Sequence, residues 1–311
     1  MRHVIALDVG GTGVKAALVG LDGALLCETR RATGRERGPA AVVESILGCA
    51  KDLSVHGQTH FGTAAEAVGI TVPGIVDAER GVAVHSADLG WRNVPLRGLL
   101  GHRLGRIPVA LGHDVRTRGL AEGRVGAGRG TGRFLFVSLG SAITGAIGMD
   151  DGIEAGAHGC AGEIGHIVVR PGGPVCGCGG RGCLEAVASA AAVGRAWSTA
   201  VGGERTADAA DCARAVEAGD EAASGVWRAA VDAVADGLVT ALTVLDPRTL
   251  VIGGELAEAG DTLFTPLRAA VAERVTFQKL PAIVPAALGD AAGYVGAGLL
   301  ARDLLATAAA G

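Results

Sequence analysis

Three cysteines and one histidine lie close together in the middle of this chain and constrain its fold more than any other local feature. Cys176, Cys178 and Cys183 have C-x-C-x4-C spacing, and His166 precedes the first of them by ten residues. Three thiolates and one imidazole match the tetrahedral coordination of Zn²⁺, and the glycines between them allow a tight loop. The alternative is three buried thiols beside a surface histidine. The pattern favours a structural zinc site, because four protein ligands leave no coordination position open.

Two carboxylates flank these candidate metal ligands. Glu163 lies three residues before His166, and Glu185 lies two residues after Cys183. A bound metal would hold both carboxylates near one another, which suits the recognition of hydroxyl groups. His166 could bind the metal through one ring nitrogen and offer the other to a hydroxyl or a supporting partner. The alternative for each glutamate is a helix-end cap or a solvent-exposed position.

A glycine-rich turn follows the first apolar strand of the chain. Gly10 and Gly11 come directly after the run HVIALDV, and Asp8 is the second-last residue of that run. Glycine permits close approach of the backbone, so N–H groups can point at phosphate oxygens. Asp8 could hold Mg²⁺ through water, while Thr12 and Lys15 could add a hydroxyl group and a cation. The alternative is a tight hairpin capped by an aspartate, since an isolated glycine motif is a weak signal.

Two further glycine sites follow apolar strands in the second half of the chain. Gly140 and Ser141 come after the run FLFVSL, and Gly253 and Gly254 end the run TLVIGG. The site at Gly140 and Ser141 matches the loop at Asp8 and predicts a second phosphate contact. The site at Gly253 and Gly254 is suited to binding adenosine. Ordinary turn chemistry is the alternative for both. Three such sites at three strand ends support one another, because ligands of α/β folds bind beyond strand ends.

Composition limits the classes to which the chain can belong. With 311 residues, 49% of them hydrophobic, it is long enough for two domains with sizeable cores. A net charge of −4 gives no basic footprint for nucleic acid. The apolar run 225–245 contains three charged residues, which excludes a lipid-facing helix. The N-terminus lacks the apolar stretch of a signal peptide, so we expect a cytoplasmic protein with no membrane partner.

The pattern of elements predicts an α/β fold with an internal duplication. A β–turn–β unit with glycines at the bend occurs near residues 8–11 and again near 140–145, each followed by helices and further strands. Two such units indicate one phosphate loop per domain. We place the boundary near residues 113 and 114. The predicted domains are therefore 1–113, joined by the C-terminal helix 291–311, and 114–290, which carries the zinc motif.

Taken together, these motifs resemble those of the ROK family of sugar kinases. The strongest match is the string from Glu163 to Glu185, which contains EIGH and CGCGGRGCLE. The strings DVGGT at 8–12, PGIVD at 73–77 and DP…VIGG at 246–254 also fit. The resemblance spans nearly the whole chain.

The resemblance implies an actin-like (ribonuclease H-like) ATPase fold of two domains with a cleft between them. It implies ATP and Mg²⁺ as well as structural Zn²⁺, a sugar substrate, and a homodimer or homotetramer. The general base of the family lies in a motif similar to N-D-x-N, and that place reads His113-Asp114-Val115-Arg116 here. Asp114 is therefore the implied catalytic base. The implied substrate-binding positions are Pro73, Gly74, Asp88, His113, Glu163, His166 and Glu185.

Four positions depart from the family pattern. His113, Arg116 and Asp88 each stand where the family usually has asparagine, and Ala142 stands where it has glycine. Cations on both sides of Asp114 would lower its proton affinity and weaken the base. We expect a modified sugar, such as an amino sugar or a cyclitol, to be preferred over glucose. The alternatives are a weakly active enzyme or a sugar-binding regulator. ROK regulators carry a winged helix-turn-helix before the first phosphate motif, and the first strand here begins too early to leave room for one.

Overall fold

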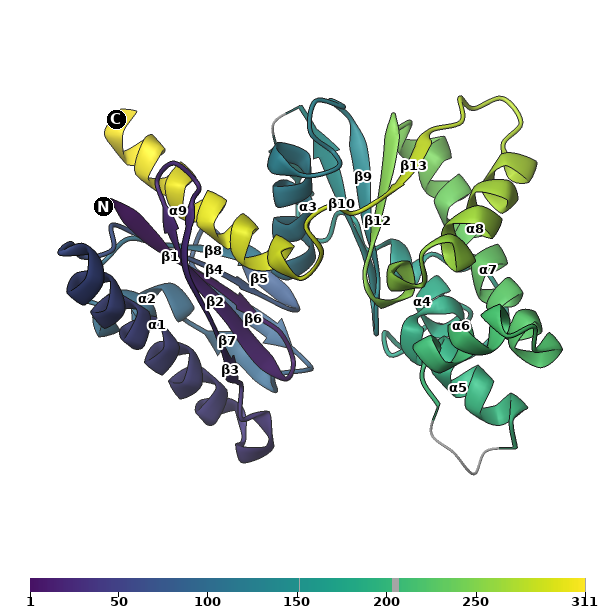
Figure 1. The fold of residues 1–311 in the computed structure, drawn as a ribbon, viewed down its shortest axis with the longest axis horizontal. Helices are drawn as coiled ribbons and strands as arrows, with labels where there is room; N and C mark the ends of the chain where they lie inside the picture. Colours follow the sequence, from purple (N-terminus) through teal and green to yellow (C-terminus); the bar gives the residue numbers. More distant parts are fainter. Residues whose placement is uncertain (151, 203–206, 311) are drawn as a thin grey trace. The chain divides into compact units, whose positions relative to one another are not determined.

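The computed structural model describes residues 1–150, 152–202 and 207–310 and divides the chain into two compact units (Figure 1). The first unit consists of Met1–Ala121, Gly156–Cys160 and Asp290–Gly311. The second unit consists of Glu122–Ala155 and Ala161–Gly289. Each unit is built around one mixed five-stranded sheet.

The sheet of the first unit has the strand order β3-β2-β1-β4-β8. Its strands are β1 (His3–Val9), β2 (Gly13–Gly20), β3 (Leu25–Ala32), β4 (Val68–Val72) and β8 (Val109–His113). β1, β2 and β3 form an antiparallel meander, and β4 and β8 continue the sheet in parallel from β1. A separate small sheet consists of β5 (Ile75–Asp77), β6 (Val82–Ser86) and β7 (Trp91–Val94).

Helices cover both faces of the first sheet, which explains why every residue of β1 is buried (Figure 1). Ile5 and Leu7 of β1 belong to a core that includes α1 (Pro39–Phe61) and α2 (Leu96–Arg103). Val4 and Ala6 point to the opposite face, where they pack with α9 (Ala292–Ala310). A strand covered on both sides reads as a continuous apolar run, and the sequence of β1 shows such a run.

Gly69 of β4 marks the point where α9 comes closest to the sheet. A Cβ at this position would lie 1.8 Å from the carbonyl oxygen of Ala297. The obstructing atom belongs to the backbone, so it cannot rotate out of the way. We therefore expect Gly69→Ala to destabilise the protein by about 1–3 kcal/mol, measured as a lower midpoint of denaturant unfolding. Gly98→Ala is the matched control, because its Cβ meets nothing within 4 Å.

The sheet of the second unit repeats the strand order of the first as β11-β10-β9-β12-β13. Its strands are β9 (Phe134–Leu139), β10 (Ile143–Met149), β11 (Gly152–Glu154), β12 (Thr249–Gly253) and β13 (Ala282–Pro285). β9, β10 and β11 form an antiparallel meander, and β12 and β13 run parallel to β9. This repetition agrees with the duplication that the two β–turn–β units predict.

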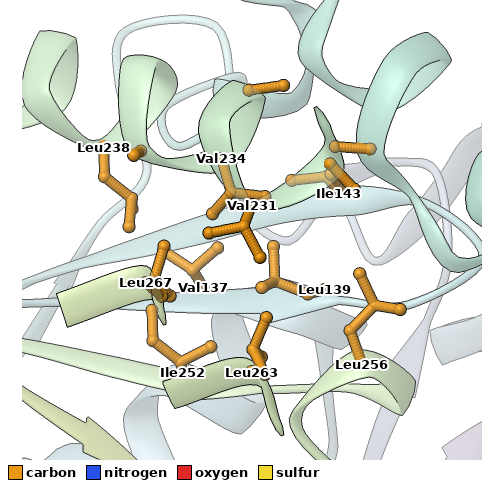
Figure 2. Close-up of a cluster of buried hydrophobic side chains, with 14 of the residues drawn as sticks. Val137, Leu139, Ile143, Val231, Val234, Leu238, Ile252, Leu256, Leu263 and Leu267 are labelled. Carbon is orange, nitrogen blue, oxygen red and sulfur yellow. The ribbon is translucent and has the colours of Figure 1, made fainter. Parts of the chain in front are cut away.

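One large apolar core fills the second unit between its sheet and its helices. The helices are α4 (Leu184–Ala188), α5 (Ala190–Ala200), α6 (Ala209–Glu217), α7 (Glu221–Leu245) and α8 (Asp261–Arg274). Val231 and Val234 of α7 lie over Val137 and Leu139 of β9, as Figure 2 shows. Asp232 and Asp236 of α7, which interrupt the apolar run of the sequence, instead pair with Arg274 of α8. No helix among the described residues meets the length and hydropathy that a membrane span requires.

The connection between the two sheets begins with α3 (Asp114–Val125), which follows β8 directly. The first residues of α3 belong to the first unit, and Glu122 begins the second. The fully buried Glu122 carboxylate accepts backbone N–H groups from Ala127, Ala287 and Leu288 at 2.8–3.1 Å. Glu122 therefore joins the end of α3 to the segment that follows β13.

Candidate functional site

The turn after β1 forms a closed loop that the neighbouring backbone holds in place. The Gly10 N–H group donates to the Gly13 carbonyl at 2.8 Å. Thr33 fixes the outer side of the loop, because its N–H group donates to the Thr12 carbonyl and its hydroxyl group to the Gly11 carbonyl. A Cβ on Gly11 would lie 3.5 Å from Nη1 of Arg35, so a cationic side chain lies beside the loop.

Asp8 lies at the base of this loop and is almost fully buried, with 2% of its surface exposed. Its Oδ2 accepts a charge-assisted hydrogen bond from Nη2 of Arg118 at 3.2 Å. Burial raises the pKa of Asp8, while the positive charge of Arg118 opposes that rise. Oδ1 of Asp8 is buried and has no hydrogen-bond partner in the described part of the chain. An acceptor oxygen left open in this way fits a water molecule of a hydrated Mg²⁺ ion.

Lys15, a predicted phosphate ligand, lies on β2 and pairs with an acidic residue. Its Nζ lies 2.6 Å from Oδ1 of Asp290, whose other carboxylate oxygen accepts from Arg30 at 3.3 Å. The Lys15 ammonium group thus forms an ion pair with Asp290, which lies just before α9.

Asp114 lies where β8 ends and α3 begins, so its carboxylate is part of a helix N-terminus. Its Oδ1 accepts a hydrogen bond from the Val115 N–H group at 2.8 Å, and 21% of its side-chain surface is exposed. Burial raises the pKa of Asp114 above the ordinary aspartate value of 3.8, with Arg118 and Arg116 acting in the opposite direction. The effect of burial therefore outweighs that of the two cations, and the pKa of Asp114 is raised, where the sequence led us to expect a lowered proton affinity.

His113 is neutral and therefore adds no positive charge beside Asp114. Burial, aided by the positive charge of Arg116, lowers the pKa of His113 to about 3. Nδ1 of the ring accepts the Arg116 N–H group at 3.3 Å, which assigns the proton of the neutral ring to Nε2. The 3.3 Å between Nδ1 of His113 and Oδ1 of Asp114 is therefore no ion pair. Nη1 of Arg116 donates to the Gly159 carbonyl at 2.8 Å and so binds the 156–160 segment.

The remaining predicted positions of the first unit lie in the turns that follow β4 and β6. Pro73 and Gly74 follow β4, and a Cβ on Gly74 would lie 2.2 Å from the His85 carbonyl oxygen, so the turn needs a glycine there. Asp88 is exposed in the turn between β6 and β7, and its own Cβ lies 4.0 Å from the position a Cβ on Gly11 would take. The negative charge of Asp88 also contributes to the raised pKa of Asp114.

The second unit carries the other two glycine sites at adjacent strand ends. The Gly140 N–H group donates to the Ala142 carbonyl at 3.0 Å, which closes the loop that contains the exposed Ser141. Gly254 has a φ of 89°, and a Cβ there would lie 2.6 Å from the Leu139 backbone. Gly253 is the last residue of β12, which runs parallel to β9. The two turns therefore meet at the same edge of the sheet.

Glu185 contributes to this second loop. It lies in the first turn of α4, and its Oε2 accepts the Ile143 N–H group at 3.0 Å, directly after the loop. Ala142, which departs from the family pattern, does not adopt a positive φ, so its Cβ imposes no backbone strain. Both observations indicate that the second loop is well formed in this chain.

The four candidate metal ligands come together in the second unit. Sγ of Cys176 lies 3.7 Å from Nδ1 of His166, and Sγ of Cys178 lies 3.8 Å from Sγ of Cys183. All four donor atoms lie within 4.8 Å of one another. Ligands at the usual zinc distances on a tetrahedron are about 3.5–3.8 Å apart, so the cluster fits Zn²⁺. Nε2 of His166 is turned toward Glu163, whose Oε2 lies 4.0 Å away.

The backbone around the cluster donates a hydrogen bond to one candidate ligand and forms the tight turn that brings the ligands together. The Gly180 N–H group donates to Sγ of Cys178 and lowers the pKa of that thiol, which favours the thiolate that binds metal. Gly182 has a φ of 72°, and a Cβ there would lie 1.7 Å from the Arg170 carbonyl oxygen. Arg170 in turn pairs with Asp236 of α7 at 2.6 Å and so fastens the loop to the core.

Two charged residues that lie beside predicted site residues were not expected from the sequence: Arg118 and Arg35. Arg118 could have been found, because it follows Asp114 by four residues and therefore shares its face of a predicted helix. Arg35 gave no local signal, since the Gly11 that it lies beside comes from a different turn of the chain.

Two α/β sheets of the same strand order, each with a glycine loop between its first two strands, define the actin-like class of folds. A family model described as the ROK family matches residues 4–304. The chain belongs to the ROK family.

Individual relatives agree with this assignment over nearly the full length of the chain. Glucokinase of Thermotoga maritima is 34% identical over 315 residues, covering 96% of this chain and 97% of that protein. A ROK hexokinase structure from Thermus thermophilus superposes with a TM-score of 0.83 at 30% identity, covering 98% and 100% of the two chains. A ROK glucokinase structure from Streptomyces griseus, in complex with glucose and AMPPNP, gives a TM-score of 0.81 at 30% identity, covering 97% and 99%.

Proposed function

We propose that this protein is an ATP-dependent sugar kinase that transfers the γ-phosphoryl group to a hydroxyl of a hexose or hexose-like sugar. The observation that carries the proposal is the Asp114 carboxylate, held by the Val115 N–H group at the start of α3 in the position of the family's general base. The similarity to glucokinases and to a structure with glucose and an ATP analogue supports the same activity.

The proposed reaction needs a proton acceptor and a stabilised phosphoryl group. The sugar oxygen forms a bond to the γ-phosphorus, the bond from that phosphorus to the bridging oxygen breaks, and ADP leaves. Asp114 accepts the hydroxyl proton as the bond forms. A positioned general base commonly raises the reaction rate about 10²–10⁴-fold. The N–H groups of Gly10 and Gly140 already donate within their loops, so the other backbone N–H groups of these loops bind phosphate oxygens. Asp8 would hold Mg²⁺, which would supply neutralisation of the phosphate charge.

Each unit has its own proposed ligand-binding residues. The first provides Pro73, Gly74, Asp88, His113 and Asp114 for the sugar, and Gly10, Gly11, Thr12 and Lys15 for the nucleotide. The second provides Glu163, His166 and Glu185 for the sugar, and Gly140, Ser141, Gly253 and Gly254 for the nucleotide. Zn²⁺ on the four clustered ligands would have a structural role. The most direct test is release of ADP on addition of sugars. Lack of sugar-dependent release across a broad panel would contradict the proposal.

The neutral His113 ring leads to a prediction about the substrate. Asparagine, the family residue here, offers both a donor and an acceptor. His113 uses Nδ1 for the Arg116 N–H group, so it can offer a sugar only the Nε2–H donor. A hydroxyl that must donate at this point would be left unpaired, and such mismatches can cost several orders of magnitude in discrimination. We therefore expect glucose not to be the best substrate.

This prediction is tested by comparing kcat/KM values among sugars. The panel consists of glucose, mannose, fructose, N-acetylglucosamine, N-acetylmannosamine and a C7-cyclitol. We expect a sugar other than glucose to have the highest value, and we expect His113→Asn to raise the value for glucose. The prediction is wrong if glucose leads the panel with kcat/KM above about 10⁴ M⁻¹s⁻¹, the low end for ordinary enzymes.

A further inference from the structure

One charged side chain beside Asp8 has no part in the proposed reaction. Arg118 lies on α3 one helical turn beyond Asp114, on the same face of the helix. Its Nη2 donates to Oδ2 of Asp8 at 3.2 Å, and its side chain keeps 30% of its surface exposed whereas Asp8 keeps 2%. Arg118 therefore reaches from the helix of the proposed base to the carboxylate of the proposed Mg²⁺ position.

The ion pair leaves two buried polar atoms without partners. In the described part of the chain, neither Oδ1 of Asp8 nor Nε of Arg118 has a hydrogen bond. Buried polar atoms are costly when unpaired, so the two side chains are poised for an additional polar ligand. Gly293 of α9 makes room for the Asp8 carboxylate, because a Cβ there would lie only 2.0 Å from Oδ2. Arg118 is hydrogen-bonded to this carboxylate, so any second cation must approach it while Arg118 is present.

The charges around Asp8 determine what the arginine does there. The negative charge of Asp114 acts on Asp8, and the negative charge of Asp88 acts on Asp114. Arg118 is the cation in hydrogen-bond contact with Asp8, and it compensates this charge in the absence of a metal. A divalent cation that binds at Oδ1 meets a carboxylate whose charge the guanidinium already partly neutralises, and it is repelled by that guanidinium.

We propose that Arg118 is a positioning residue that acts as a resident counter-ion of Asp8 and competes with Mg²⁺ for its charge. The inference rests on the proposed function, because it takes the Mg²⁺-nucleotide complex as the ligand. Arg118 keeps the Asp8 carboxylate ordered before nucleotide binds and raises the Mg²⁺ concentration that nucleotide binding requires. A neutral side chain at this position would leave Asp8 with its full charge for the metal.

The experiment measures nucleotide binding by thermal shift, which does not depend on turnover. The unfolding midpoint is recorded at a fixed ADP concentration while free Mg²⁺ is titrated, and a ligand that binds the folded state raises it. For Arg118→Met we expect the half-saturating Mg²⁺ concentration to fall about tenfold, within the usual range of coupling between charged ligands. Arg118→Lys keeps the charge and should remain near the wild-type value. Arg103→Met is the matched control, because its partner is the surface residue Glu44.

The outcomes separate this inference from the proposed function. If wild-type protein phosphorylates a sugar but Arg118→Met has an unchanged or higher half-saturating Mg²⁺ concentration, the inference is wrong and the function stands. If wild-type protein shows neither kinase activity nor Mg²⁺-dependent stabilisation by ADP, both are wrong. Arg118→Gln, which can still donate a hydrogen bond to Asp8, provides the same test should the methionine variant not fold, and the same fall is expected.

Discussion

Asp114→Asn is expected to lower kcat for the best sugar by about 10²–10⁴-fold while leaving the affinity for that sugar nearly unchanged. The asparagine keeps the shape of the side chain and an oxygen that can accept the Val115 N–H group, but it cannot take the proton of the attacking hydroxyl. Steady-state kinetics and equilibrium sugar binding measure the two effects separately. Asp22→Asn, the same change in the exposed turn between β2 and β3, serves as the control. Turnover near the wild-type rate in Asp114→Asn would show that Asp114 is not the base.

The same variant should be at least as stable as the wild type, and more so at higher pH. Burial raises the pKa of Asp114 in the folded protein above its ordinary value of 3.8, so ionisation of this group costs more in the folded state than in the unfolded chain. This free-energy cost of ionisation is absent at pH values below 3.8, and it reaches its full size at pH values above the raised pKa of the folded state. The gain in unfolding midpoint for Asp114→Asn should therefore be larger at pH 8 than at about pH 4, which unfolding scans at both pH values would measure.

Cys178→Ser is expected to reduce bound zinc from one ion per chain to a small fraction and to lower the unfolding midpoint by about 10 °C. A serine hydroxyl is a poor zinc ligand, and without the metal the loop that holds Cys176 and Cys183 loses its main constraint. Sugar affinity should fall as well, because the same loop positions His166 and Glu185. Metal analysis, unfolding scans and sugar titration measure the three effects.

The exposed Cys160 provides the control for this prediction, because it lies outside the cluster. Cys160→Ser should retain both zinc and stability. A chelator should lower the unfolding midpoint of the wild type but leave that of Cys178→Ser unchanged. Freshly purified wild-type protein that contains no zinc would contradict the assignment.

The sequence predicted the elements that have a strong local signal. The buried strands β1, β4, β8, β9 and β12 are apolar runs that end in glycine, proline or a polar residue, and each is present in the structure. The Cys/His cluster was predictable because its four residues lie within 18 residues of one another. The apolar segment after the cluster forms two helices, because Ser189 ends α4 and caps α5 by accepting the Ala192 N–H group.

Properties that depend on distant contacts were not predictable in the same way. The three short strands between Ile75 and Val94 lack clear alternation, and their pairing as a separate sheet decides their conformation. The neutral state of His113 follows from its burial and from the Arg116 charge, whereas the sequence shows only two basic residues near an aspartate. The ion pairs of Asp8 with Arg118 and of Lys15 with Asp290 join residues 110 and 275 positions apart.

The position of α9 in the sequence has a consequence for the order in which the two units can form during synthesis. The helix follows the whole of the second unit in the chain, yet its residues Tyr294 and Ala297 bury Val4 and Ala6 of the first strand. A ribosome completes the second unit before it releases the segment that closes the first, although domains usually form from the N-terminus onward. One apolar face of the first sheet therefore stays uncovered until translation of this helix, and it is the surface that a nascent-chain chaperone would meet.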